Sequence, residues 1–97
     1  MERRESKRIK KRSILKINNT PAILLDFSRK GISFSMNKAP INRGVDILFD
    51  IGDQTFEIKA TTCWIKQKIA LSKSFDIGAF IEEAPEEYYQ FVDNQRN

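Results

Sequence analysis

The regular alternation of apolar and polar residues is the feature that most constrains how this chain can fold. In the segment Gly31–Met36, the apolar side chains of Ile32, Phe34 and Met36 alternate with two serines. A period of two places the apolar side chains on one face of a half-buried β-strand. The same pattern recurs along the chain and predicts six strands, at about residues 13–17, 22–28, 31–36, 44–51, 54–66 and 75–81.

Turn-forming segments separate several of these strands. The cluster Asn18–Pro21 predicts a turn between the first two strands. Gly52 and Asp53 predict a two-residue hairpin turn, because glycine tolerates the positive φ that such turns need. A polar connector, roughly residues 67–74, precedes the last strand. Since no helix separates consecutive strands, we expect an antiparallel sheet.

The period changes after the last strand. Pro85 and the acidic residues that follow it suit the first turn of a helix. Tyr88, Phe91 and Val92 then share one helical face, so we expect a short helix that packs on the strands, with Tyr88 and Tyr89 as packing residues. The predicted fold is mainly β: a small six-stranded antiparallel β-barrel with a short C-terminal α-helix.

Most aromatic side chains of the strands fall on the predicted inward face. These residues are Phe27, Phe34, Phe49, Phe56 and Trp64. Trp64 is therefore expected in the core, and the alternative is that its indole forms a wall beside a ligand. With these rings inside, no exposed aromatic row is expected for stacking on nucleic acid.

Composition narrows the chemistry that the chain can perform. Its 97 residues suffice for one domain, and they include no histidine, which excludes catalytic triads or dyads that need an imidazole. Cys63 is the single cysteine, so neither a disulfide framework nor a cysteine-rich zinc site is expected. P-loops, membrane-spanning apolar runs and a secretory signal are also absent from the sequence. We therefore expect a cytoplasmic, non-enzymatic protein without a metal or cofactor.

Basic residues are concentrated at the N-terminus. Residues 1–17 contain eight Lys or Arg and two Glu, a net charge of +6, whereas the remaining residues carry −2. We divide the chain into a basic flexible arm, residues 1–12, and a β-barrel with its helix, residues 13–97. Such an arm favours an anionic partner, for example a nucleic acid, a phosphorylated ligand, an acidic protein or anionic lipid. A solvated tail without a partner is the alternative.

The arm contains a pair of arginines with the spacing RxxxR. Arg4 and Arg8 form this motif, and Arg8 and Arg12 form a second copy. Arginine carries a planar fork of donors that grips phosphate and stacks on flat rings. We favour the Arg4–Arg8 copy because it lies further from the first strand, in a freer part of the arm.

A second motif, DxSxxG, lies where the second strand meets the third. It runs from Asp26 through Ser28 to Gly31, with Phe27 expected in the core and Asp26 and Ser28 on the opposite, exposed face. A carboxylate accepts hydrogen bonds from a donor-bearing base edge such as that of guanine. The alternative is a tight turn in which Asp26 and Ser28 bond nearby backbone amides.

Together, in this order and on this strand plan, the two motifs resemble those of the PilZ domain family. The resemblance covers about residues 3–92. Cys63 and Trp64 are similar to the end of a V-x-W segment of the family, and the segment Asp76–Ile81 to its final strand. The resemblance implies a non-catalytic receptor that binds cyclic di-GMP and relays the signal to a separate effector protein.

By position, the resemblance assigns the ligand contacts to five residues. They are Arg4, Arg8, Asp26, Ser28 and Gly31. The family pattern implies that the arginines stack on guanine and contact phosphate, that the Asp and Ser face the guanines, and that the glycine keeps the backbone close. On this interpretation the partners are cyclic di-GMP and an unidentified effector protein, with no DNA or RNA and no membrane span.

Another class of function also agrees with the basic arm. A degenerate PilZ-like barrel could use the arm to bind an acidic protein or a nucleic acid without any nucleotide. A steep salt dependence with no preference among anions would favour that interpretation. An enzymatic function has the least support, because the sequence offers no nucleophile–base pair.

Overall fold

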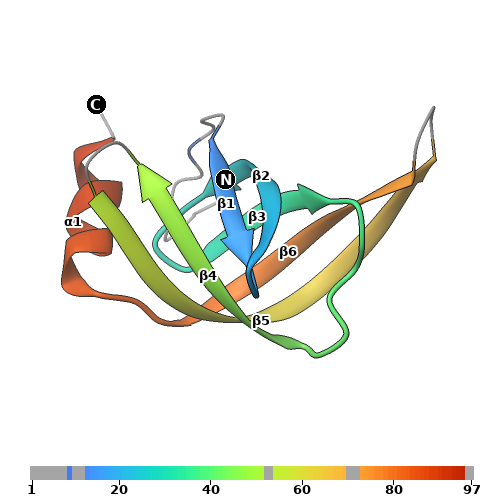
Figure 1. The fold of residues 1–97 in the computed structure, drawn as a ribbon. Helices are drawn as coiled ribbons and strands as arrows, with labels where there is room; N and C mark the ends of the chain where they lie inside the picture. The colour runs from blue at the N-terminus through green and yellow to red at the C-terminus, as the bar shows by residue number, and fades with distance from the viewer. Residues whose placement is uncertain (1–8, 10–12, 52–53, 70–72, 96–97) are drawn as a thin grey trace, which may run out of the picture.

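Residue 9 and residues 13–51, 54–69 and 73–95 are described by the structure, which is a computed structural model. Six strands are followed by one helix (Figure 1). The elements are β1 (Ile14–Ile17), β2 (Thr20–Phe27), β3 (Gly31–Met36), β4 (Gly44–Ile51), β5 (Gln54–Ile69), β6 (Lys73–Glu83) and α1 (Glu86–Asn94). The mainly β class with a short C-terminal helix is confirmed.

The six strands close into an antiparallel barrel in the order β1-β2-β3-β6-β5-β4. Each half of the chain forms a three-stranded meander, and the two meanders join where β3 pairs with β6 and where β1 pairs with β4. Closure pairs the strands that would otherwise be sheet edges. The predicted barrel is confirmed, and the two long-range pairings are additions that the sequence pattern did not specify.

The first hairpin turn is tighter than the predicted cluster. Asn18 and Asn19 form the turn, with φ values of 51° and 73°, and β2 already begins at Thr20. Two successive positive φ values are typical of a two-residue hairpin turn, and asparagine adopts them more readily than most residues. The other predicted turn, Gly52 and Asp53, lies outside the described residues.

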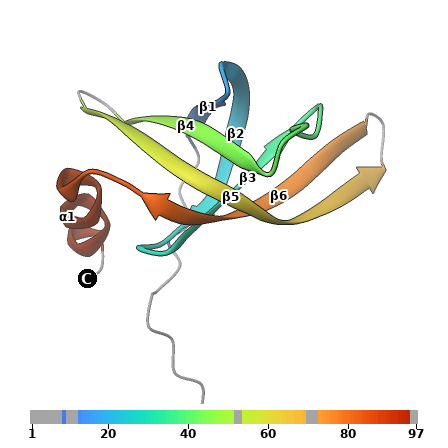
Figure 2. The same ribbon diagram turned by 90° about the horizontal axis from the view of Figure 1, so that it is seen from below.

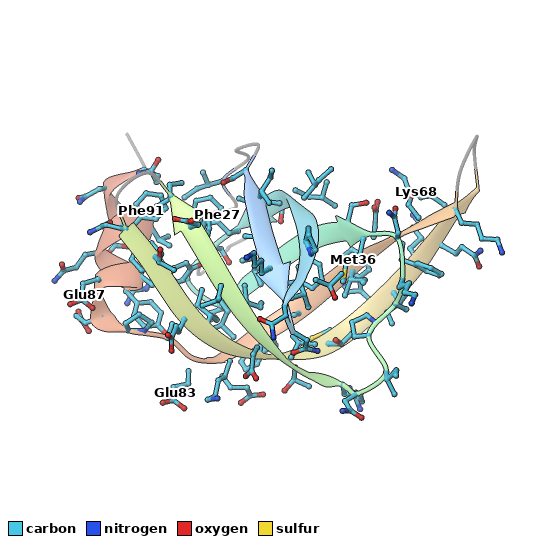
Figure 3. All side chains as sticks on the ribbon, in the orientation of Figure 1. Phe27, Met36, Lys68, Glu83, Glu87 and Phe91 are labelled. Atoms are coloured by element: carbon cyan, nitrogen blue, oxygen red, sulfur yellow. The ribbon has the colours of Figure 1, made fainter. Side chains whose placement is uncertain are left out.

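The last hairpin is longer than predicted. The polar connector expected at residues 67–74 is partly strand, because β5 continues to Ile69 and β6 starts at Lys73. The two strands extend together past the rest of the barrel (Figures 1 and 3), and Lys68 Nζ lies 3.4 Å from an Asp76 carboxylate oxygen. This part of the hairpin covers little of the core, so it lacks the apolar alternation from which strands are predicted.

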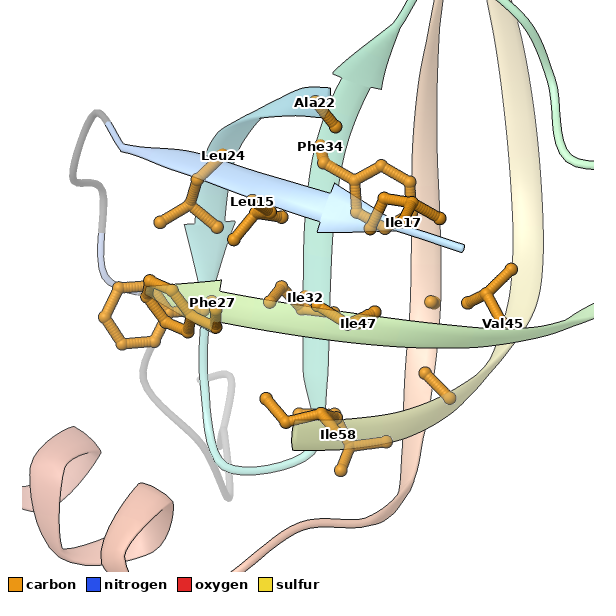
Figure 4. Packing of buried hydrophobic residues seen from close by; sticks show 14 of the residues in the cluster. Leu15, Ile17, Ala22, Leu24, Phe27, Ile32, Phe34, Val45, Ile47 and Ile58 are labelled. Carbon is orange, nitrogen blue, oxygen red and sulfur yellow. The ribbon is translucent and has the colours of Figure 1, made fainter. Parts of the chain in front are cut away.

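The barrel interior is filled by the side chains that the alternation placed inward (Figure 4). Phe34, Phe49 and Ile77, for example, are fully buried. Helix α1 lies at one end of the barrel (Figures 1 and 2), where the Phe91 ring stacks on the Phe27 ring with centroids 5.7 Å apart. Tyr88 is also fully buried, so the packing role predicted for the apolar face of this helix is confirmed.

Candidate ligand-binding site

The DxSxxG motif forms the loop between β2 and β3, and its serine is enclosed by that loop. Ser28 Oγ accepts hydrogen bonds from the backbone N–H of Gly31 at 3.1 Å and of Lys30 at 3.3 Å. The Ser28 N–H in turn donates to the Gly31 carbonyl at 2.8 Å. The Ser28 side chain is buried, so its predicted place on an exposed face is wrong. The hydroxyl instead satisfies backbone donors that the tight turn would leave unpaired.

Asp26 lies just before this loop on the outer surface of the barrel. Its carboxylate accepts a hydrogen bond of 2.8 Å from the Ser33 hydroxyl of the neighbouring strand β3. Phe27 points into the core, as predicted, and Asp26 is half-buried. A register shift between Leu24 and Asp26 marks a bulge in β2 at this point. Bulges change the direction in which neighbouring side chains point, and this bulge precedes the motif directly.

Trp64 lies on the outer surface and not in the core. The register between β5 and β6 pairs Thr62 with Ala79 and Trp64 with Gly78, which leaves Cys63 as one extra residue in β5. This bulge reverses the alternation of inward and outward side chains, so the indole is 50% exposed. The prediction of a core tryptophan is therefore wrong, because it assumed an uninterrupted period of two.

The outward-facing Trp64 occupies the space above a glycine. A Cβ added to Gly78 would lie 2.2 to 2.6 Å from three atoms of the indole, which no real packing allows. The ring can therefore lie directly on the strand only because residue 78 has no side chain. Glycines in strand interiors often mark such a close approach.

The strand registers join these residues into one row across the outer face of four strands. Asp26 pairs with Ser33, Ser33 with Gly78, and Gly78 with Trp64, along β2, β3, β6 and β5. We call this set the Asp26–Trp64 row. Three strand spacings of about 4.8 Å separate its ends, a backbone distance of about 14 Å. A carboxylate thus lies at one end of the row and an exposed indole at the other.

An open cleft of about 610 Å³ follows this row. Its lining includes Asp26, Lys30 and Gly31 from the motif, together with Trp64 and the half-exposed ring of Phe80. The cleft therefore combines a hydrogen-bond acceptor, a cation and two aromatic surfaces. Such a set suits a planar ligand that carries N–H donors and negative charge. Sequence analysis did not name Phe80 as a site residue, and its two neighbours on β6, Ala79 and Ile81, are buried in the core.

The motif loop is fastened to helix α1. The Tyr88 hydroxyl donates a buried hydrogen bond of 2.7 Å to the carbonyl of Ser28. The Arg29 guanidinium donates to both carboxylate oxygens of Asp93, at 2.9 and 3.1 Å, and its central carbon lies 4.9 Å from the centroid of the Tyr89 ring. These contacts join residues that are 60 and 64 positions apart in the sequence, and no sequence pattern predicts them. They hold the loop against the end of the barrel.

The arginines of the arm lie outside the described residues, but Ile9, which follows Arg8 in the sequence, is described. Arg4, Arg8 and Arg12 all belong to this group. Ile9 forms an antiparallel bridge with Phe27, with N–H to carbonyl distances of 2.8 and 3.0 Å in the two directions. This bridge holds the backbone of the arm at residue 9 beside the DxSxxG motif.

Two other features concern cofactors and membranes. Within residues 13–51, 54–69 and 73–95, no group of three or more cysteine, aspartate or glutamate side chains is arranged to hold a metal ion. Among the same residues, no helix has the length and apolar character needed to cross a bilayer.

Comparisons with known proteins identify a shared fold. No protein-family profile matches the chain, and no curated protein sequence matches it. The chain is similar to the solved structure of the Bacillus subtilis inhibitor of motility (MotI/DgrA), with a TM-score of 0.77 and 14% sequence identity. The match covers 95% of this chain and 48% of the other, so this chain spans about half of that protein's length. We conclude that this chain has the fold of that part of the motility inhibitor.

Proposed function

We propose that this chain is a cytoplasmic, non-catalytic receptor of the PilZ type that binds cyclic di-GMP in the cleft along the Asp26–Trp64 row. The observation that carries the proposal is the row itself, which joins the DxSxxG motif to an exposed indole across four strands. The fold shared with the inhibitor of motility supports the same assignment. On this proposal the bound state is recognised by a separate effector protein.

The chemistry of the cleft agrees with a ligand that has two guanines and two phosphates. The Asp26 carboxylate can accept hydrogen bonds from the N1–H and N2–H₂ groups of guanine, which offers these donors side by side. The exposed face of Trp64 offers a stacking surface, and stacking of one base on an aromatic ring contributes about 1–3 kcal/mol. Lys30 adds positive charge at the same cleft. Because the ends of the row are about 14 Å apart, a two-base ligand can engage both ends.

Among the arginines of the arm, Arg8 is the one that directly precedes the described residue Ile9 in the sequence. Consecutive Cα atoms are about 3.8 Å apart, so the peptide bond keeps Arg8 next to Ile9, whose backbone pairs with Phe27. Arg12 is instead next to Ser13, whose carbonyl accepts from the Leu24 N–H before the bulge of β2. Arg8 also belongs to both copies of RxxxR. We assign it the phosphate and guanine contacts, with Arg4 as its partner.

Ser28 and Gly31 act in this proposal through the shape of the loop. The Ser28 hydroxyl is bonded to the loop backbone, and Gly31 lines the cleft where β3 begins. Both residues therefore position Asp26 and Lys30 for the ligand.

Calorimetric titration at physiological salt tests the proposal. We expect saturable binding of cyclic di-GMP, with GMP and cyclic di-AMP as controls that bind more weakly. Arg8→Ala and Asp26→Asn should each reduce the affinity by about tenfold or more, since each removes a charge-assisted hydrogen bond. Asp46→Asn, which changes an exposed carboxylate on β4 outside the cleft, is the matched control and should bind as the unaltered chain does. The proposal is overturned if cyclic di-GMP gives no heat, or if both site variants keep full affinity.

A second candidate function rests on the exposed aromatic side chains. Sequence analysis placed Trp64 inside and expected no exposed aromatic row, yet Trp64 and Phe80 are 50% and 47% exposed on the outer face. Exposed rings beside a basic segment can bind single-stranded nucleic acid. Binding of an oligonucleotide that weakens steeply with added salt, together with no response to cyclic di-GMP, would favour this function.

A further inference from the structure

The side of the barrel formed by β1 and β4 carries apolar side chains that the nucleotide cleft does not use. Ile14 of β1 is 64% exposed and Ile23 of β2 is 49% exposed, and the two are paired across the strands. Leu48 of β4 is half-buried on the same outer face. These three side chains line an open groove of about 770 Å³. Exposed apolar side chains gathered in this way commonly mark a contact surface.

Two opposite charges border the apolar side chains. Lys16 pairs with Leu48 across β1 and β4, and both line the groove. Continuing the same antiparallel register by one step places Asp50 beside Ile14. Lys16 and Asp50 are both exposed, and the Asp50 carboxylate accepts a hydrogen bond of 3.1 Å from the Thr55 hydroxyl. None of the ion pairs between described residues involves Lys16. The face thus contains a block of four side chains: Ile14 beside Asp50, and Lys16 beside Leu48.

The arrangement of this block is complementary to itself. Ile14 and Leu48 occupy one diagonal of the block, and Lys16 and Asp50 occupy the other. A two-fold axis along the apolar diagonal brings Ile14 against its own copy and Leu48 against its own copy. The same axis places Lys16 of each chain opposite Asp50 of the other. Interfaces between identical chains are usually of this two-fold kind, in which one patch meets itself.

We propose that the β1–β4 face is the surface through which two copies of this chain associate. The apolar diagonal supplies the buried area, and the two Lys16–Asp50 pairs fix the orientation and disfavour other partners. The patch is small, so the association is reversible and depends on concentration. In Figure 1, β1 and β4 lie side by side, and the groove on their outer face is lined by no residue of α1. The proposal does not depend on nucleotide binding.

A charge exchange followed by analytical ultracentrifugation tests this surface in the absence of nucleotide. Lys16→Asp places two like-charged pairs across the axis, and Asp50→Lys does the same with the opposite sign. Each single change should raise the dimer dissociation constant by about tenfold or more, because repulsion replaces attraction at two positions. The double variant K16D/D50K restores both pairs in exchanged order and should return to within about threefold of the unaltered chain.

Substitution of an isoleucine that lies on the two-fold axis provides a second, independent test. Ile14→Glu brings two carboxylates face to face and should leave only monomer at every concentration. Ile41→Glu is the matched control, because Ile41 is 97% exposed and lies outside this face, and it should associate normally. Circular dichroism checks that each variant is folded. The proposal is overturned if the unaltered chain is monomeric throughout, if the double variant dissociates as readily as the single variants, or if I41E is as disruptive as I14E.

Discussion

At the scale of single residues, Gly78 and Trp64 depend on each other. Gly78→Ala would put a methyl group 2.2 Å from the nearest indole atom, so the ring has to move off the strand. We expect the variant to fold with a loss of about 1–3 kcal/mol in the free energy of unfolding. Its affinity for cyclic di-GMP should also fall, because the stacking surface is displaced.

Chemical denaturation and calorimetry measure these two effects. Gly44→Ala is the control, since nothing lies within 4 Å of a Cβ at that position. Equal behaviour of the two alanine variants would contradict the role given to the glycine beneath Trp64.

Asp26 and Ser28 belong to one motif but should respond differently to substitution. Ser28→Ala removes a buried hydroxyl that holds two backbone N–H groups, so we expect a loss of about 1–2 kcal/mol in stability. Asp26→Asn keeps the size of a half-buried side chain and should change stability by less than about 1 kcal/mol while reducing nucleotide affinity. Urea denaturation, compared with the calorimetric titrations, separates the structural role of Ser28 from the ligand-binding role of Asp26. A stability loss in D26N as large as that in S28A would argue that the whole motif is merely a structural turn.

Alternation predicted the inward place of Phe27 correctly but failed at Ser28 and at Trp64, for two different physical reasons. It predicts which face a side chain occupies only within a strand and only while the register between strands is unbroken. Ser28 lies beyond the end of β2, where its hydroxyl is bonded to the loop backbone. Trp64 follows a register shift after Thr62, and no residue of that segment marks the bulge in advance, since the glycine beneath the indole is on the partner strand.

At the scale of secondary-structure elements, the contact between the motif loop and α1 is the main structural support of the site. Tyr88→Phe removes the hydroxyl that donates to the Ser28 carbonyl, and we expect a loss of about 1–2 kcal/mol in stability. Asp93→Asn weakens an exposed ion pair with Arg29, and its effect on stability should stay below about 1 kcal/mol.

Thermal and urea denaturation of the two variants check this ranking. The nucleotide affinity of Y88F should also decrease, because the loop that follows Asp26 and contains Lys30 loses its anchor. If D93N destabilises the protein more than Y88F does, the exposed ion pair and not the buried hydrogen bond is the principal anchor.

The helix itself was predictable, whereas its attachment to the loop was not. Pro85, the acidic residues after it and the spacing of Tyr88 to Val92 are local signals, and α1 begins at Glu86 as they indicate. The partners Arg29 and Asp93 are 64 positions apart in the sequence. Such a pair forms only when the fold brings the β2–β3 loop and α1 together.

At the scale of the whole molecule, the barrel separates two surfaces. The Asp26–Trp64 row lies across β2, β3, β6 and β5, whereas the proposed association face lies on β1 and β4. This separation follows from the pairings β3 with β6 and β1 with β4, which close the sheet. Local alternation predicts the strands but not which distant strands pair with each other. Neither surface could therefore be predicted from the sequence alone. The DxSxxG motif is the part of the first surface that the sequence pattern does predict.

The emission of Trp64 tests the central claim, that cyclic di-GMP binds along this row, most directly. Trp64 is the one tryptophan of the chain and its indole is half exposed, so its fluorescence reports on this cleft alone. We predict a saturable change in emission on titration with cyclic di-GMP, with the same dissociation constant as calorimetry, and no such change with cyclic di-AMP. Emission that stays constant while calorimetry shows saturation would place the ligand elsewhere, and it would contradict the account.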